Sequence, residues 1–219
     1  MAQLFSPQAN VYSRVILFLV VFLICFGGFA TEKIYWSPYT TYVNIPFHQP
    51  VPFSHKHHVA EDGIDCRYCH TSVEKSSFAG VPPTETCMTC HSQIWTDSPM
   101  LAPVRASLAT NTPLKWNRVH DLPDFAYFNH SIHISKGIGC STCHGRVDQM
   151  PLTRKVETLY MKWCLDCHRN PQKYVRPRDK IYDMAWKPAE DRHGEGERLI
   201  REYRIDTSGR LTNCSTCHR

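Results

Sequence analysis

Ten of the eleven cysteines in this chain belong to five copies of the motif Cys-x-x-Cys-His, and this repetition constrains the fold more than any other feature. The motif is the one that attaches c-type haem. Its two thiols form thioethers with the vinyl groups on one edge of the porphyrin, and the adjacent imidazole ligates the iron. The ten thiols are Cys66, Cys69, Cys87, Cys90, Cys140, Cys143, Cys164, Cys167, Cys214 and Cys217. The five predicted proximal ligands are His70, His91, His144, His168 and His218.

Two other uses of paired cysteines fit this pattern less well. A zinc ribbon takes two Cys-x-x-Cys knuckles for each metal, so five copies are an odd number, and zinc does not require a histidine after each. The stretch WCLDC at residues 163–167 resembles a thioredoxin-type redox site. One such copy would leave that interpretation open, whereas five copies that each continue into histidine do not. We therefore expect five covalently bound haem c groups, which are attached outside the cytoplasm.

Five haems in 219 residues leave little room for a core of side chains. We expect the porphyrins to form the core, with loops and short helices wrapped around them. Fifteen prolines and long stretches without apolar periodicity agree with this picture. The predicted fold class is a multihaem cytochrome c that is mostly irregular, with short α-helices, little β-structure and one N-terminal transmembrane helix.

An apolar segment near the N-terminus has no charged residue between positions 15 and 30. Counted from Val11, with Arg14 reaching back to the surface, it is long enough to span a bilayer core of about 30 Å. Aromatic residues flank it, as in an interfacial belt. We expect residues 1–31 to be a transmembrane anchor and residues 32–219 a periplasmic pentahaem domain.

The alternative for this segment is a cleaved signal peptide, for which residues 28–30 offer an acceptable small-x-small cleavage site. The run is long for a signal peptide, which favours an anchor. Both interpretations place the bulk of the chain across the membrane, because Arg14 lies on the short N-terminal side. Cys25, within the run, is interpreted as a small apolar residue of the span.

The chain contains an internal repeat. Residues 53–70 and 128–144 share the pattern Phe-x-His-x-x-His, a short spacer, Gly-Ile and then the haem motif. One further motif follows each copy. The sequence therefore predicts two two-haem units, at about 53–91 and 128–168, and a fifth haem at the C-terminal end.

The repeat separates the histidines that can serve as distal ligands from one that cannot. His57 aligns with Ile132, which cannot ligate iron, so the repeat gives His57 no support. In a helix, residues three apart share one face. Two such imidazoles cannot serve one iron that already has a proximal ligand, so each pair is expected to serve two neighbouring haems. The predicted distal ligands are His55, His58, His130 and His133. The alternative is that some of them lie at the surface or bind haem propionates.

The fifth distal ligand is left open by the repeat. The candidates are His48, His120, His193, Met150, Met161 and Met184. We expect Met161, which precedes Cys164 by three residues, then Met150, then His120. A methionine ligand would raise the reduction potential of that haem relative to bis-histidine haems. For any single methionine, core packing is the alternative.

The Phe-x-His-x-x-His pattern ahead of the haem motif resembles the class III and c7-type multihaem cytochromes, in which the two histidines serve different haems. The whole plan also resembles the pentahaem cytochrome subunits of bacterial alternative complex III. The resemblance rests on the anchor and on the stretches FSHKHH, LPDFAYFNHSIH, MKWCLDCHR and LTNCSTCHR. It implies a subunit of a quinol-oxidising complex in the bacterial inner membrane. The implied partners are an iron–sulfur subunit, integral membrane subunits and another c-type cytochrome that leads toward a terminal oxidase.

The predicted function is electron transfer by a membrane-anchored subunit that is not an enzyme on its own, because iron with both axial positions filled binds no substrate. The net charge of +5 is too mild to indicate nucleic acid as a partner. The alternative is a NapC/NrfH-type quinol dehydrogenase, which oxidises quinol at a membrane-proximal haem. In such proteins the first motif follows soon after the anchor, whereas 35 residues separate Ala30 from Cys66 here. A haem reductase with one open iron is a third option.

Overall fold

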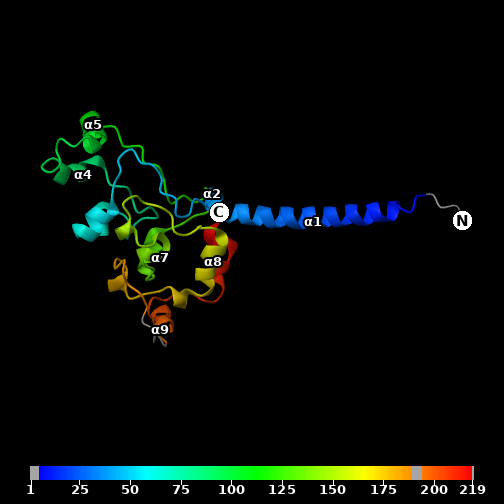
Figure 1. Cartoon of the computed structure of the whole chain (residues 1–219). Coiled ribbons are helices and arrows are strands. Elements are labelled where there is room, and N and C mark those ends of the chain that lie inside the picture. Colours follow the sequence, from blue (N-terminus) through cyan, green and yellow to red (C-terminus); the bar gives the residue numbers. More distant parts are fainter. Residues whose placement is uncertain (1–4, 189–193, 219) are drawn as a thin grey trace. The chain divides into compact units, whose positions relative to one another are not determined.

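The computed structural model describes residues 5–188 and 194–218. It divides the chain into two compact units, Met1–Val43 and Asn44–Arg219. The first unit consists mainly of one long helix, α1 (Ala9–Tyr35), followed by the short helix α2 (Pro38–Thr41) (Figure 1).

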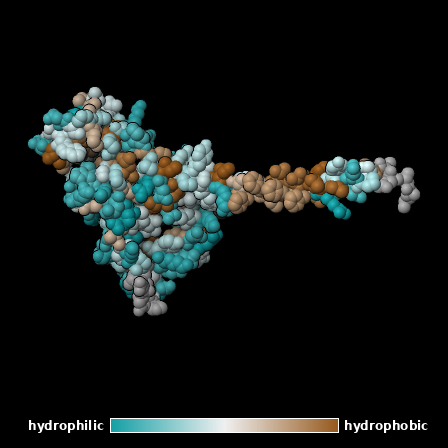
Figure 2. All heavy atoms as spheres, in the orientation of Figure 1, coloured by the Kyte–Doolittle hydropathy of each residue, from teal (hydrophilic) through white to brown (hydrophobic). Residues whose placement is uncertain are grey.

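Helix α1 is apolar along most of its length, as Figure 2 shows. It has 27 residues, none of them buried, which corresponds to about 40 Å at 1.5 Å per residue. By length and composition it can cross a membrane, although a signal sequence near an N-terminus satisfies the same criteria. Within it, the rings of Phe18, Phe22 and Phe26 stack one turn apart. The expectation of one N-terminal apolar helix is therefore confirmed.

The second unit is built from short helical pieces joined by irregular segments. They are η1 (Lys56–Glu61), α3 (Cys66–Cys69), α4 (Thr84–His91), η2 (Pro99–Leu101), α5 (Ala102–Thr110), α6 (His130–Ser135), α7 (Cys140–His144), η3 (Val147–Gln149), α8 (Met161–Arg169), η4 (Pro171–Lys173), η5 (Arg178–Lys180), α9 (Glu195–Glu202), η6 (Arg210–Thr212) and α10 (Cys214–Cys217). In the described residues, β-structure is limited to isolated bridges between Pro46 and Arg154 and between Ile138 and Val175. The predicted mostly irregular, helical and nearly strand-free fold is confirmed.

The two cysteines of every haem motif lie in one short helix, in α3, α4, α7, α8 and α10. A helical turn places residues three apart on one face, so the two cysteines of each motif point in the same direction. Side-chain caps start two of these helices. The Asp65 carboxylate accepts from the backbone N–H of Arg67, and the Asn213 side chain accepts from that of Ser215.

The core of apolar side chains is small and divided. One cluster contains Val51, Leu101 and Val104, and another contains Val175, Leu199 and Tyr203. Neither cluster includes the histidines of the repeat. The histidines of the repeat therefore lie outside the buried apolar clusters, whereas Cys87 of the second haem motif packs against the first cluster.

Candidate haem-binding sites

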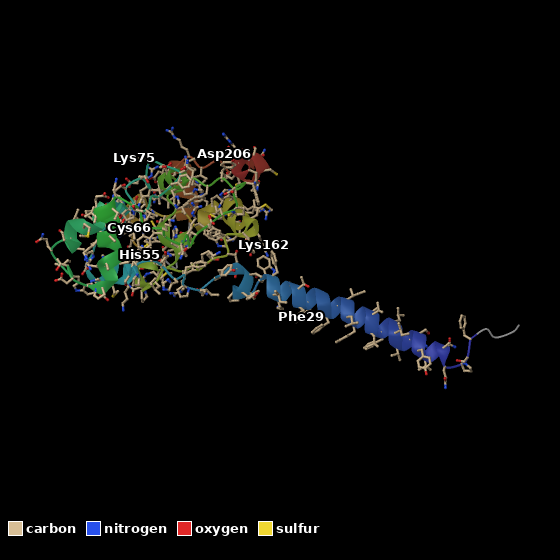
Figure 3. The ribbon with its side chains drawn as sticks, turned by 90° about the horizontal axis from the view of Figure 1, so that it is seen from above. Phe29, His55, Cys66, Lys75, Lys162 and Asp206 are labelled. Carbon is tan, nitrogen blue, oxygen red and sulfur yellow. The ribbon has the colours of Figure 1, made fainter. Side chains whose placement is uncertain are left out.

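Each of the four histidines of the repeat faces one motif histidine. The pairs, with the distance between ring centroids, are His55 and His70 at 6.5 Å, His58 and His91 at 6.1 Å, His130 and His144 at 6.4 Å, and His133 and His168 at 6.2 Å. The sequence predicts that the two distal histidines of each repeat serve two different haems. In the structure, each of these imidazoles lies next to a different haem motif. Figure 3 shows His55 on its segment near Cys66, the first thiol of the motif that ends at His70.

The separation within these pairs suits two axial ligands of a single iron. With metal–nitrogen bonds of about 2 Å and about 1 Å from ring nitrogen to centroid, two axial imidazoles have centroids about 6 Å apart. Two of the pairs also have nearly parallel rings, at 9° for His55 and His70 and at 11° for His130 and His144. The four pairs thus have the dimensions of bis-imidazole iron sites.

The Nδ1 atoms of these imidazoles and of His218 all have a hydrogen-bond partner in the protein. Seven contact main-chain oxygens: His70 on Gly80, His91 on Ile94, His168 on Leu211, His218 on Phe125, His58 on Ser54, His130 on Ser77 and His133 on Asn129, at 2.7–3.3 Å. A carbonyl oxygen can only accept, so Nδ1 carries the proton. The lone pair is then on Nε2, which is the atom left to bind a metal.

Two imidazoles depart from this rule by contacting side chains. Nδ1 of His55 lies 3.0 Å from Oγ1 of Thr153, and Nδ1 of His144 lies 3.3 Å from Nε2 of His120. Thr153 was not among the residues predicted from the sequence, and His120 was considered only as an iron ligand. Neither contact could be found from the motif spacing, because Thr153 lies 98 residues from His55 and His120 lies 24 from His144.

One phenylalanine holds both distal histidines in each repeat. Phe53 lies edge-on to His55 at 4.9 Å and stacks on His58 at 4.4 Å. Phe128 lies edge-on to His130 at 4.7 Å and stacks on His133 at 4.4 Å. The shared Phe of the repeat therefore sets the angle between the two imidazoles, which explains why it recurs.

The glycine of the Gly-Ile pair has the same backbone conformation in both repeats. Gly63 has φ +71° and Gly137 has φ +78°, a region that side-chain-bearing residues rarely adopt. At each, the next residue's N–H donates to the carbonyl of the second distal histidine, Ile64 to His58 and Ile138 to His133. This turn leads the chain from the distal histidines into the haem motif.

Each repeat also forms a hydrogen bond with a segment that follows a haem motif of the other two-haem unit. His55 of the first repeat contacts Thr153, which follows the third motif. In return, Nδ1 of His130 in the second repeat donates to the carbonyl of Ser77 at 2.8 Å, and Ser77 follows the first motif. The orientation of one distal ligand in each unit therefore depends on the other unit.

His57 lies at the surface and pairs with no motif histidine. Its Nδ1 is 2.9 Å from Oε2 of Glu61, and its ring stacks on Trp95 at 6.2 Å. The hydrogen bond to Glu61 and the charge of Asp62 raise the pKa of His57. His57 is therefore a surface residue that pairs with Glu61, and its counterpart in the second repeat is Ile132.

The fifth motif has a different environment. The ring of Phe125 lies 5.8 Å from that of His218, and no imidazole of the described residues is paired with His218 as the four repeat histidines are paired with theirs. Met161 is 65% exposed at the start of α8, whereas Met150 and Met184 are buried at 2% and 6% exposure. His48 is exposed, and His193 lies outside the described residues. Of the methionines considered, Met161 is the one whose thioether is accessible.

Burial favours the neutral, ligating form of the paired histidines. Burial, with His70 nearby, lowers the pKa of His55 to about 4. Burial, with His120 nearby, lowers the pKa of His144 to about 3. Burial followed by the charge of Lys155 lowers the pKa of His120 to about 4. Near neutral pH these imidazoles carry a free lone pair for a metal or a hydrogen bond.

Exposed apolar side chains beside the motifs fit a porphyrin. Tyr68, Phe78, Val81, Phe125 and Ile132 are 49–72% exposed, and each lies within a motif or on a segment that borders one. Soluble surfaces rarely gather such side chains without an apolar partner. Together with the paired imidazoles and the cysteines on single helical faces, they make the chain a fitting host for covalent haem.

The five haem motifs are numbered 1 to 5 in chain order, from Cys66–His70 to Cys214–His218. Their contacts in the structure follow a different order. Motif 1 touches motif 2, because the Tyr68 hydroxyl lies 2.9 Å from the Thr89 hydroxyl. Motif 1 also approaches motif 3: Arg67 stacks on Tyr182 at 4.5 Å, and the neighbouring Ile181 accepts from the backbone N–H of Cys140. Motif 2 is thus joined to motif 3 through motif 1.

The remaining links are between motifs 3 and 4 and between motifs 4 and 5. Helix α6 carries both His130, which faces motif 3, and His133, which faces motif 4. His168 of motif 4 donates to Leu211 in η6, which directly precedes motif 5. The spatial order is therefore 2, 1, 3, 4, 5.

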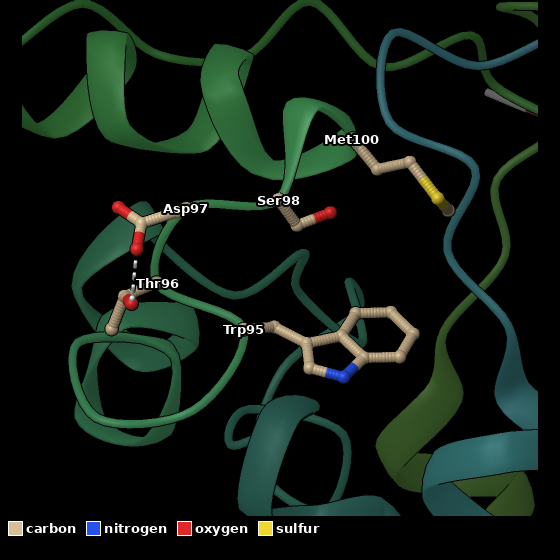
Figure 4. Close-up of a pocket in the computed structure, with 5 residues that line it drawn as sticks. All are labelled: Trp95, Thr96, Asp97, Ser98 and Met100. Atoms are coloured by element: carbon tan, nitrogen blue, oxygen red, sulfur yellow. Dashed lines mark hydrogen bonds between the residues drawn. The ribbon is translucent and has the colours of Figure 1, made fainter.

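A shallow hollow after motif 2 is lined by Trp95, Thr96, Asp97, Ser98 and Met100 (Figure 4). Its lining offers one carboxylate, and Thr96 contacts that Asp97 at 3.4 Å. The hollow lacks the paired acid–base groups or convergent donors of a catalytic site. We assign it no chemistry.

Residues 126–219, which contain motifs 3, 4 and 5, match the family model described as cytochrome c7 and related cytochrome c. This part of the chain is similar to multihaem cytochrome domains of the c7 type, the resemblance that the repeat pattern predicts. The chain is also similar to a curated protein, the menaquinone reductase multihaem cytochrome c subunit of Nitratidesulfovibrio vulgaris (strain Hildenborough). The two are 38% identical over 97 residues, which cover 44% of this chain and 45% of that protein. The chain thus spans about half the length of the curated relative that it matches.

Proposed function

We propose that this chain is a membrane-anchored pentahaem c-type cytochrome that transfers electrons within a respiratory quinone-linked complex. The observation that carries the proposal is the set of four imidazole pairs, each 6.1–6.5 Å apart and each joined to one haem motif. Haem supplies one-electron redox chemistry at its iron. The chain's own part is to occupy both axial positions and to hold the sites close together.

The proposed residue roles follow the geometry. The ten motif cysteines attach five haems, and the five motif histidines are the proximal ligands. The distal partners are His55 for His70, His58 for His91, His130 for His144 and His133 for His168. For His218 we propose Met161, because its side chain is exposed and α8 lies against η6 next to motif 5. Met150 is the weaker candidate because it is packed in the protein interior.

The complex that we propose is of the alternative complex III type, in the bacterial inner membrane, with the haem domain in the periplasm. The proposed single-pass anchor is residues 1–31, whose apolar run lies in helix α1 (Ala9–Tyr35), with residues 32–219 outside the membrane. An iron–sulfur subunit and integral membrane subunits would deliver electrons from quinol, and another c-type cytochrome would receive them. The similarity to a subunit of a menaquinone reductase supports a quinone-linked assembly.

That same similarity favours a second candidate, in which the complex reduces menaquinone and electrons run in the opposite direction. The two candidates use the chain in the same way and differ in what lies at each end. The intact complex, purified in detergent, would be supplied either with quinol and oxidised cytochrome c or with reduced cytochrome c and menaquinone. Rapid turnover in the first assay supports alternative complex III, and turnover confined to the second supports the reductase.

Electron transfer itself is tested by an anaerobic redox titration followed by EPR. The proposal predicts five haems per chain, all six-coordinate and low-spin. A high-spin haem that binds nitric oxide or nitrite in the purified protein would show an open iron and favour a reductase. Direct quinol oxidation by the isolated chain would favour the NapC/NrfH-type alternative.

A further inference from the structure

The proximal histidine of motif 3 has an unusual hydrogen-bond partner. In the other four motifs, Nδ1 of the proximal histidine contacts a main-chain oxygen, that of Gly80, Ile94, Leu211 or Phe125. Nδ1 of His144 instead lies 3.3 Å from Nε2 of His120, with the ring centroids 4.2 Å apart and the planes at 71°. A non-motif imidazole therefore stands where every other site has a carbonyl.

The direction of this hydrogen bond follows from the pair on the other side of the ring. His144 faces His130 at 6.4 Å with parallel rings, so its Nε2 is the atom proposed to face the iron. Its Nδ1 must then carry the proton and donate. Nε2 of His120 can accept only through its lone pair, which places the proton of His120 on Nδ1.

An imidazole nitrogen is a more basic acceptor than a peptide oxygen. A proximal histidine that donates to a stronger acceptor gains negative character at the ring and becomes a better electron donor to iron. This stabilises the ferric state and lowers the reduction potential, since hydrogen bonding around the axial ligand is one of the protein's means of tuning it.

We propose that His120 is a positioning residue for the third haem site, which fixes the tautomer and rotation of His144 and lowers the reduction potential of that haem. The proposal rests on the proposed function, because it takes His144 to be an iron ligand. It also assigns a role to a histidine that lies outside both repeats. His70, the equivalent of His144 in the first repeat, donates to Gly80, so the two repeats acquire different proximal ligands.

The test compares three forms of the full-length protein: the wild type, His120→Phe and His120→Gln. Phenylalanine keeps a ring but has no acceptor, and glutamine offers a carbonyl like that of the other four sites. His57→Phe is the matched control, because His57 is exposed and pairs with Glu61. The readouts are haem content, EPR spin state and the five midpoint potentials from an anaerobic titration.

We expect all variants to hold five low-spin haems. One midpoint potential should rise in His120→Phe and rise less in His120→Gln, with no change in His57→Phe. Potentials equal to the wild type in both His120 variants would overturn the proposal. Conversion of one haem to high-spin would also overturn it, since His120 would then be an iron ligand. If the Phe variant fails to take up haem, the Gln variant decides, and an unshifted potential there overturns the proposal. A wild-type protein that lacks a low-spin third haem would instead contradict the proposed function.

Discussion

The two repeats reach the same arrangement of imidazoles through different helices. The first pair of distal histidines lies at the start of η1, a π-helix, and the second pair lies on α6, an α-helix. Even so, Phe53 and Phe128 contact their two histidines at distances that agree within 0.2 Å. The phenylalanine and the positive-φ glycine, which both repeats share, therefore determine the ligand geometry, and the type of helix between them is secondary.

The two repeats differ in the hydrogen-bond partners of their proposed histidine ligands. His55 contacts a threonine hydroxyl where His130 contacts the main chain of Ser77, and His144 contacts His120 where His70 contacts the main chain of Gly80. Both of the contacts to side chains fall on the sites of motifs 1 and 3, which are neighbours in space. The second and third sites of the order 2, 1, 3, 4, 5 are therefore the ones whose hydrogen-bond partners can be changed by side-chain substitutions.

The largest effect is expected from removing a distal ligand. His58→Ala and His133→Ala should each convert one of five haems to high-spin. The reason is that the iron proposed to bind His91 or His168 loses its second imidazole ligand. EPR and optical spectra of the oxidised proteins measure the change. His57→Ala is the control and should leave the spectra unchanged. The reverse outcome would break the equivalence of the two repeats.

A smaller effect is expected from removing the shared phenylalanine. Phe53→Ala and Phe128→Ala should each lower the free energy of unfolding by about 1–3 kcal/mol, since the ring packs on two ligands in a half-buried position. Thermal unfolding followed by haem circular dichroism measures the loss. Phe5→Ala, at a side chain that is 75% exposed and lies outside the haem-binding unit, is the control. Effects in one repeat only would show that the phenylalanines have different roles.

Removal of the Thr153 hydroxyl, which contacts His55, should have a modest effect on one midpoint potential. Thr153→Val preserves shape and removes the acceptor of the His55 Nδ1–H, at 3.0 Å. The potential changes by the difference in hydrogen-bond strength between the ferric and ferrous states, so one midpoint potential should rise by at most about 40 mV, the one-electron equivalent of a hydrogen bond of about 1 kcal/mol. A redox titration measures it, with Thr110→Val as the surface control. If no potential moves, the contact does not tune the first site.

The smallest effect is expected where motifs 1 and 2 touch. Tyr68→Phe removes the hydroxyl that lies 2.9 Å from that of Thr89, in a partly exposed position. The free energy of unfolding should fall by about 0.5 kcal/mol, with ligation unchanged. Chemical denaturation gives the first quantity and EPR the second. A change of spin state would mean that the contact is part of a ligand site.

Much of this arrangement could be predicted from the sequence, because the ligands are encoded locally. The motif fixes the proximal histidine, and the alignment of His57 with Ile132 separates it from His55 and His58. Which distal histidine faces which motif could not be read, because spacing along a helix only places two side chains on one face. Thr153, His120 and the adjacency of motifs 1 and 3 depend on contacts between distant segments. Those contacts come from the tertiary fold, which no local pattern records.

Four of the five haem sites are proposed to have two histidine ligands, and the fifth is proposed to differ. Near-infrared magnetic circular dichroism of the fully oxidised protein tests this assignment most directly, because the ligand-to-iron charge-transfer band separates bis-histidine from histidine–methionine haems. We expect four low-spin bis-histidine haems and one histidine–methionine haem, with the histidine–methionine signal lost in Met161→Ala. Fewer than four bis-histidine haems would contradict the pairing of the two repeats.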